Sequence, residues 1–176
     1  PVMNADNFNF MKKGLEEIYK KVMVLVYNVG NFYGEYKEDG DENYEASENL
    51  MDKWIISRTE DLARVVGEDL EAYNTVKACA FIRKYIDDLS TWFVRNSRDR
   101  FNDNDKASRK TLRYVLEKLV RVIAPIMPFS AEKIFQDMNG KEKSVHLEDW
   151  PEYNEKAIDA ELESSMEEVR EIVSQG

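Results

Sequence analysis

Apolar side chains recur every three or four residues along four long stretches of this chain, and polar turns separate the stretches. This spacing is typical of amphipathic helices, because positions three and four apart share one face of a helix. The chain has only 7 glycines and 4 prolines in 176 residues, which favours long regular elements over a turn-rich β fold. The sequence therefore predicts an all-α antiparallel bundle of four to five helices, with the four main helices over residues 10–36, 51–73, 75–93 and 112–123.

Prolines interrupt the chain after the fourth stretch. Pro125 and Pro128 cannot continue a helix, because proline lacks an amide proton and clashes with the preceding turn. Ser130 after them can cap a helix, which predicts a short fifth helix over residues 131–138.

The remaining chain reads as an appendage. Residues 141–150 look irregular, with a short strand at residues 145–147, and an acidic amphipathic helix begins near Ile158. We therefore expect a helical bundle over residues 1–140 and, over residues 141–176, an irregular appendage that begins a further C-terminal helical region.

The charge of the chain is unevenly distributed. The net charge of −10 argues against nucleic-acid binding through global charge. Residues 95–121 nevertheless contain nine basic side chains and four acidic ones, so this segment is locally positive. It is the candidate anion-binding segment of the chain.

Five arginines in that segment share a predicted location. Arg95 and Arg98 share a helix face with Arg100 just beyond, and Arg109 and Arg113 lie four apart on the next helix. Antiparallel helices joined by a short turn would bring both sets to one end of the bundle. The guanidinium group of arginine can bind a phosphate with two parallel donors, and its flat face can stack on an unstacked base. The alternative is that these arginines pair with nearby aspartates or cap helix C-terminal carbonyls.

Three other residues give weaker evidence for a functional site. Trp92 could stack on a base, although an aromatic residue at helical spacing also suits the core. Cys79 lies in an apolar seam, and His146, the one histidine, has no second metal ligand nearby. No catalytic set, phosphate loop, metal-ligand spacing or membrane-spanning run occurs in the sequence. We therefore expect no catalytic residue, no metal and no bound cofactor in this chain.

Five segments in order resemble isoleucyl-tRNA synthetases, which are class I aminoacyl-tRNA synthetases. Residues 88–101 read D-L-S-T-W-F-V-R-N-S-R-D-R-F and resemble the family pattern D-L-S-N-W-Y-V-R-R-S-R-x-R-F. The other four segments are M-D-K-W-I-I-S-R at residues 51–58, A-P-I-M-P-F-S-A-E-K-I-F at 124–135, S-V-H-L-E-D-W-P at 144–151 and V-Y-N-V-G-N-F at 26–32. The resemblance covers about residues 7–151.

The resemblance implies the helical anticodon-binding domain of such an enzyme. It implies that the domain binds the anticodon stem-loop of isoleucine tRNA. Because the five arginines are expected at one end of the bundle, we expect the tRNA-binding residues to be Arg95, Arg98, Arg100, Arg109, Arg113 and Trp92. The family's nucleotide-binding signatures, H-I-G-H and K-M-S-K-S, are missing. We therefore expect a catalytically inactive fragment of a cytoplasmic, monomeric enzyme whose remaining domains attach isoleucine to tRNA with ATP and Mg²⁺.

Two alternatives remain at this stage. Valyl-tRNA synthetases share the bundle, although they usually have W-Y-I-E-x-x-K where this chain has the segment around Arg95. A helical protein-interaction module with acidic arms at residues 35–48 and 148–168 is the other alternative, and in that case the arginines are structural. The chain departs from the isoleucyl family pattern at Thr91, Asn96 and Asp99, and these departures reduce the positive charge of the segment.

Overall fold

The computed structural model describes residues 12–140 and 143–175, and every regular element within these ranges is helical. Two of the helical rods contain a π-helical turn between α-helical parts. The rods are formed by α1 (Lys12–Ile18), η1 (Tyr19–Met23) and α2 (Val24–Tyr36); by α3 (Leu50–Glu71); by α4 (Thr75–Asp87), η2 (Asp88–Val94) and α5 (Arg95–Asn102); by α6 (Lys106–Ile123); and by α7 (Pro128–Asn139). The predicted all-α bundle is confirmed.

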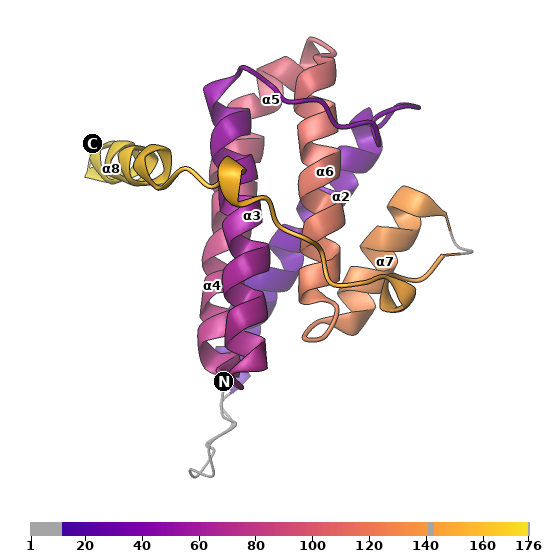
Figure 1. Ribbon diagram of the computed structural model, residues 1–176, viewed down its shortest axis with the longest axis vertical. Helices are drawn as coiled ribbons and strands as arrows, with labels where there is room; N and C mark the ends of the chain where they lie inside the picture. Colours follow the sequence, from indigo (N-terminus) through magenta and orange to yellow (C-terminus); the bar gives the residue numbers. More distant parts are fainter. Residues whose placement is uncertain (1–11, 141–142, 176) are drawn as a thin grey trace.

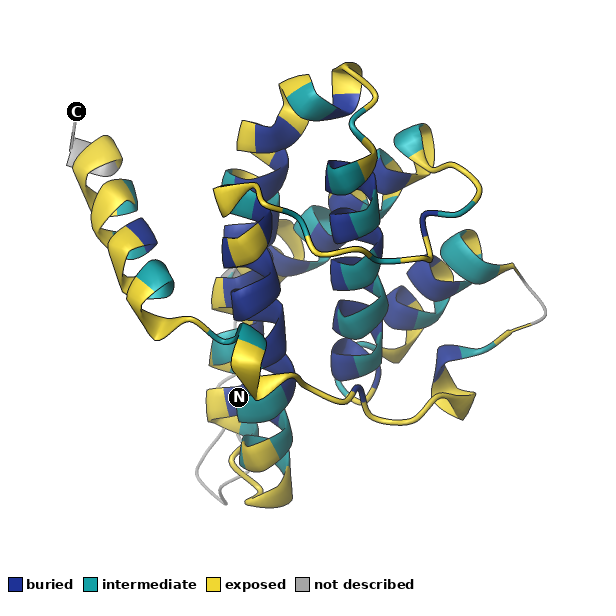
Figure 2. Ribbon diagram, turned by 45° about the horizontal axis from the view of Figure 1, so that its top comes forward, coloured by how far each residue is buried: buried dark blue, intermediate teal, exposed yellow. Residues whose placement is uncertain are grey.

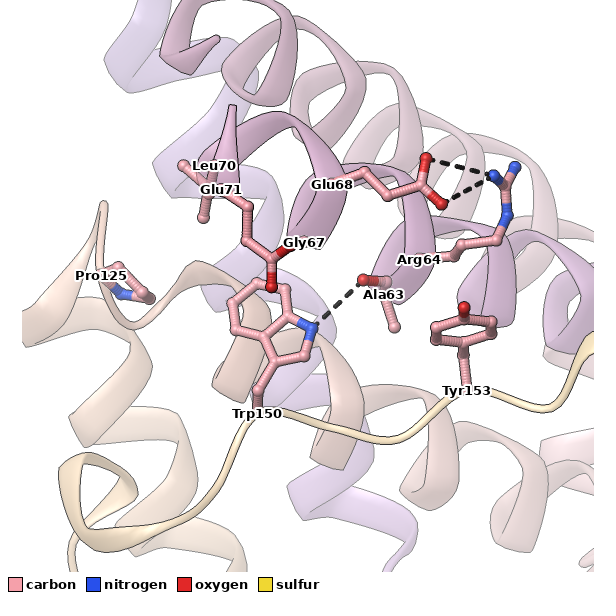
Figure 3. A pocket seen from close by; sticks show the side chains of 9 residues that line it. All are labelled: Ala63, Arg64, Gly67, Glu68, Leu70, Glu71, Pro125, Trp150 and Tyr153. Atoms are coloured by element: carbon pink, nitrogen blue, oxygen red, sulfur yellow. Dashed lines mark hydrogen bonds and ion pairs between the residues drawn. The ribbon is translucent and has the colours of Figure 1, made fainter. Parts of the chain in front are cut away.

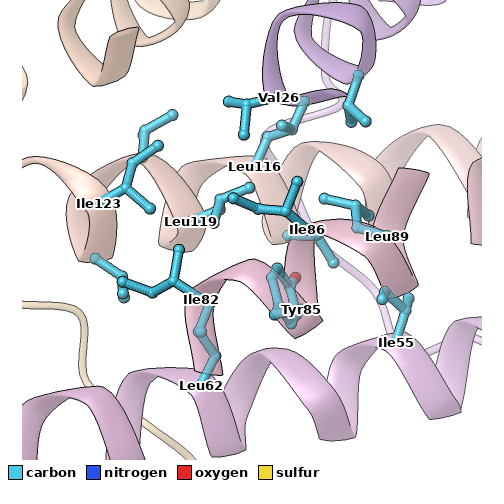
Figure 4. Close-up of a cluster of buried hydrophobic side chains, with 14 of the residues drawn as sticks. Val26, Ile55, Leu62, Ile82, Tyr85, Ile86, Leu89, Leu116, Leu119 and Ile123 are labelled. Atoms are coloured by element: carbon cyan, nitrogen blue, oxygen red, sulfur yellow. The ribbon is translucent and has the colours of Figure 1, made fainter. Parts of the chain in front are cut away.

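The helix α3 lies at the centre of the bundle and packs against both α4 and α6 (Figure 1). A tight turn joins α3 to α4, where Tyr73 has a left-handed φ of 58°. The apolar stripes of the helices face one another: Leu62, Ile86 and Leu116 are at most 1% exposed, and they meet in the middle of the bundle (Figure 4). Figure 2 shows the same pattern, with buried positions on the facing sides of the rods. Burial of this seam is the main force that holds the helices together.

The segment after α7 differs from the prediction. Residues Val145–Leu147 form a single 3-10 turn rather than a strand. The Glu132 carboxylate accepts hydrogen bonds from the Ser144 hydroxyl at 3.0 Å and from the Val145 amide at 2.9 Å. Val145 itself is buried against the core. The expectation of a strand was wrong because this carboxylate on α7 satisfies the amide that a neighbouring strand would otherwise bind.

The appendage returns across the bundle to reach the last helix, α8 (Ala160–Gln175). Glu60 of α3 is fully buried, and its carboxylate accepts hydrogen bonds from the Tyr114 hydroxyl at 2.6 Å and from the Asn154 amide at 2.7 Å. Lys118 forms an ion pair with the same carboxylate at 2.6 Å. This buried carboxylate therefore fixes the returning segment to α3 and α6.

Candidate nucleic-acid interface

The turn between α5 and α6 lies at one end of the bundle, and the predicted arginines come from the helices on either side of it (Figure 1). Asn104 adopts a left-handed φ of 60°, a conformation that asparagine tolerates better than most residues. Asp105 caps α6, because its carboxylate accepts a hydrogen bond from the Ala107 amide at 3.0 Å. The polar run at residues 102–105 thus reverses the chain within a few residues.

Arg95 and Arg98 are exposed on α5. They lie three residues apart, so they share the solvent-facing side of that helix. Within residues 12–140 and 143–175 neither guanidinium group has a hydrogen bond or an ion pair. Both groups can therefore bind a phosphate without losing an internal partner.

Arg100 is held from inside the protein. Its two terminal nitrogens each lie 2.7 Å from one oxygen of Asp52, which is fully buried at the start of α3. Its Nε donates to Asp105 at 2.9 Å. The hydrogen bonds from Arg100 to Asp52 raise the pKa of the guanidinium group, and the charge of Asp52 adds to this effect. Arg100 thus joins α5, α3 and the first turn of α6, and 23% of its side chain stays exposed.

Arg109 is 1% exposed and binds both the α5–α6 turn and the loop at residues 37–49. Its Nη1 donates to the backbone oxygen of Asn104 at 3.0 Å and also to the side-chain oxygen of that residue. Its Nη2 forms an ion pair with Glu38 at 2.6 Å, and its Nε lies 3.5 Å from Asp41. Asn104 lies in the turn beyond the end of α5, so Arg109 binds the turn and the loop at Glu38 and Asp41 rather than the C-terminal carbonyls of a helix.

Arg113 lies one helical turn further along α6 and is 8% exposed. It donates to the backbone oxygen of Met138 at 3.1 Å and to the Asn139 side chain at 2.5 Å, so it caps the end of α7. It also pairs with Glu117 at 2.6 Å. The structure therefore brings Arg100 and Arg109 to the α5–α6 turn and directs Arg113 toward α7.

Trp92 lies in η2 and is half-buried beneath α8. Its indole nitrogen donates to the Met166 sulfur at 3.3 Å, and the guanidinium carbon of Arg170 lies 5.6 Å from the ring centroid. Arg170 also pairs with the buried carboxylate of Asp88. Stacking of a base on Trp92 would therefore require α8 to move.

Two lysines of the basic segment at residues 95–121 lie near the turn but are not among the predicted tRNA-binding residues. Lys106 is exposed in the first turn of α6, and Lys110 follows four residues later. Their spacing places them on one face of the helix. That spacing is the sequence signal that could have singled them out.

A cleft of about 440 Å³ lies beside the second half of α3 (Figure 3). The Trp150 ring lies over Gly67, where an added Cβ would come within 3.1 Å of the indole nitrogen. The same nitrogen donates to the Ala63 backbone oxygen at 3.2 Å. Tyr153 and Pro125 complete the apolar lining. Arg64, Glu68 and Glu71 also line the cleft, and Arg64 pairs with Glu68 at 3.2 Å.

Among residues 12–140 and 143–175, no group of three or more histidine, cysteine, aspartate or glutamate side chains could hold a metal ion. None of the helices in those ranges combines the length and the apolar character that a membrane span requires.

Known proteins resemble this chain over most of its length. The model of a family described as the anticodon-binding domain of tRNA ligases matches residues 52–175. The isoleucine–tRNA ligase of Clostridium acetobutylicum is 37% identical over 95% of this chain. The isoleucine–tRNA ligase of Treponema denticola is 35% identical over 99% of the chain. In both cases the chain spans 18% of the length of the relative.

Proposed function

Since the chain belongs to the family of anticodon-binding domains of tRNA ligases, we propose that it binds the anticodon stem-loop of an isoleucine tRNA. Arg95 and Arg98 contact the RNA backbone. The observation that supports this proposal most directly is that both guanidinium groups are exposed on α5 and have no hydrogen bond or ion pair among the described residues. Arginine binds phosphate with paired donors, and each contact releases condensed counterions from the RNA.

The other predicted residues take secondary roles in this proposal. Arg100 keeps part of its side chain exposed, so it can reach RNA while it holds α5 against α3. Arg109 and Arg113 support the surface from beneath, through the turn and the end of α7. Trp92 contacts a base only in a state in which α8 has moved away from η2.

The parent protein of this fragment is, in the same proposal, a monomeric cytoplasmic isoleucine–tRNA ligase. Its other domains attach isoleucine to the tRNA with ATP and Mg²⁺, and the fragment alone has no such activity. Binding of the anticodon stem-loop by this domain helps to hold the acceptor end of the tRNA near the activated amino acid. Binding energy collected far from the reacting atoms thereby serves the reaction.

The test is a titration of a labelled isoleucine anticodon stem-loop at several salt concentrations. We expect Arg95→Gln and Arg98→Gln each to weaken binding. Each should also reduce the slope of log affinity against log salt by about 0.7 to 0.9, the value for one lost phosphate contact. The matched control is Arg83→Gln, because Arg83 is an exposed arginine on α4 with no ion pair in the described part of the chain.

Two results of the salt titration decide whether the proposed face is right. A slope that falls for Arg95 and Arg98 but not for Arg83 supports it. Equal effects of all three variants would mean that only net charge matters, and the proposed face would be wrong.

Stem-loops with the valine anticodon and with a scrambled loop serve as competitors. Preference for the valine loop would move the assignment to a valine enzyme, and equal binding of all loops would limit the contact to the backbone.

A further inference from the structure

Lys106 and Lys110 form a pair of positive charges on α6, on the other side of the turn from Arg95 and Arg98. The Lys106 side chain is exposed and has no ion pair within the described residues. The Lys110 ammonium group is occupied, because it donates to the Glu45 carboxylate at 2.5 Å. Glu45 belongs to the loop at residues 37–49, which the ring contact of Tyr44 with Tyr114 holds against α6.

The Glu45 carboxylate lies where an external anion would bind. The hydrogen bond from Lys110 lowers the pKa of this carboxyl group, and the charges of Lys110 and of Lys106 lower it further. Both lysines therefore act on one carboxylate. A phosphodiester group of RNA carries one negative charge, as that carboxylate does, and its oxygens accept hydrogen bonds from ammonium groups.

The contact between Glu45 and Lys110 is easily replaced. The Glu45 side chain is 78% exposed, so water and salt screen its attraction to Lys110. An ion pair with so exposed a carboxylate contributes little to the stability of a protein. Arg109 differs, because one of its partners, Asp41, is 3% exposed and also accepts a hydrogen bond from the Glu38 amide at 2.9 Å. RNA can therefore displace Glu45 more easily than the carboxylates around Arg109.

We propose that Lys106 and Lys110 form a second phosphate-binding pair for the RNA, and that the Glu45 carboxylate occupies this pair in the free protein. The inference rests on the proposed function, because it adds a second set of backbone contacts to the same interface. An RNA strand that crosses the turn meets the two arginines on α5 and the two lysines on α6. The loop at residues 37–49 then lowers the affinity of the free protein for any RNA that binds there.

The test compares two variants that change the net charge of the same loop by the same amount. Glu45→Gln removes the carboxylate from Lys110. Asp39→Asn is the control, because the Asp39 side chain is exposed and has no partner in the described part of the chain. We expect Glu45→Gln to raise affinity for the stem-loop about 2- to 5-fold at low salt, the range that follows from one exposed ion pair. Its salt slope should steepen by about 0.7 to 0.9 more than that of Asp39→Asn.

A double variant provides the second measurement. Lys110→Gln combined with Glu45→Gln should abolish the gain, because no ammonium group is left to take the phosphate. The Glu45 side chain is 78% exposed and the Lys110 side chain 17% exposed, and circular dichroism verifies that each variant is folded. Equal salt slopes for Glu45→Gln and Asp39→Asn would overturn the inference while leaving the proposed function intact. Absence of salt-dependent RNA binding by the unmodified protein would overturn both.

Discussion

Arg100 and Asp52 meet at one end of the bundle in a two-pronged contact, with each terminal nitrogen of the arginine 2.7 Å from one carboxylate oxygen. Asp52 is fully buried, and its carboxylate also accepts a hydrogen bond from the Ser47 hydroxyl at 2.6 Å. Because Arg100 follows Arg95 and Arg98 on α5, this contact fixes the helix that presents both exposed arginines. Arg100 therefore positions Arg95 and Arg98, whose guanidinium groups have no partner in the part of the chain that the structure describes.

Removal of Arg100 should destabilise the fold more than it weakens RNA contact. Arg100→Ala leaves the buried Asp52 carboxylate without its counter-charge, and we expect a loss of about 3 kcal/mol in the free energy of unfolding. Arg100→Lys keeps the charge but loses the fork, so its loss should be smaller. Urea unfolding measures both. Arg98→Ala is the control and should change stability by less than about 0.5 kcal/mol. Equal losses for Arg98→Ala and Arg100→Ala would show that the pair with Asp52 adds no stability.

Tyr33 makes the stability of the bundle sensitive to alkaline pH. It is 2% exposed on α2, and burial raises the pKa of its phenol from 10.0 to about 12. Between these values the folded protein keeps the phenolic proton and the unfolded chain releases it. The contribution of Tyr33 to stability is therefore complete below pH 10 and is lost as the pH rises toward 12.

The variant Tyr33→Phe tests this contribution. Between pH 9.5 and pH 12, we expect the unfolding free energy of the unmodified protein to fall by up to about 2 to 3 kcal/mol relative to that of Tyr33→Phe. Chemical unfolding at a series of pH values measures the difference. Tyr73→Phe is the control, since Tyr73 is 89% exposed. A difference that stays constant with pH for Tyr33→Phe would show that this phenol titrates alike in both states.

The helices could be predicted from the sequence because their signal is local. The apolar positions of α3, such as Trp54, Leu62 and Val66, repeat at helical spacing, and burial at 0 to 2% follows from that repeat. The family motif around Arg95 likewise lies within one continuous stretch of residues. A reader of the sequence needs no distant contact to find either feature.

The partners of the arginines could not be predicted in the same way. Glu38, which binds Arg109, lies 71 residues away in a loop with no apolar pattern. Met166, which covers Trp92, lies 74 residues away on a helix of its own. Charge counts place five arginines near one end of the bundle, but only the packing of distant segments decides which guanidinium groups are neutralised. Exposure of Arg95 and Arg98 is therefore a property of the fold rather than of the motif.

The last helix docks on the bundle mainly through charged groups and a single buried apolar side chain. Arg58 on α3 forms ion pairs with Glu163 at 2.9 Å and with Asp88 at 3.2 Å. Asp88 also pairs with Arg170, so one buried carboxylate links α3, η2 and α8. Met166 is 8% exposed against Trp92.

Met166→Ala should therefore release α8 while the bundle stays folded. The substitution removes the most deeply buried apolar side chain among the described residues of the helix, since Leu162 is only partly buried, and loss of a large buried side chain typically costs about 2 to 5 kcal/mol. We expect the amides of residues 163–170 to exchange with deuterium at least about tenfold faster, since each 1.4 kcal/mol of lost local stability accelerates exchange tenfold. The control is Ile172→Ala, because Ile172 is 71% exposed on the same helix. If exchange accelerated equally in both variants, general loss of helicity would explain it, and Met166 would not anchor α8.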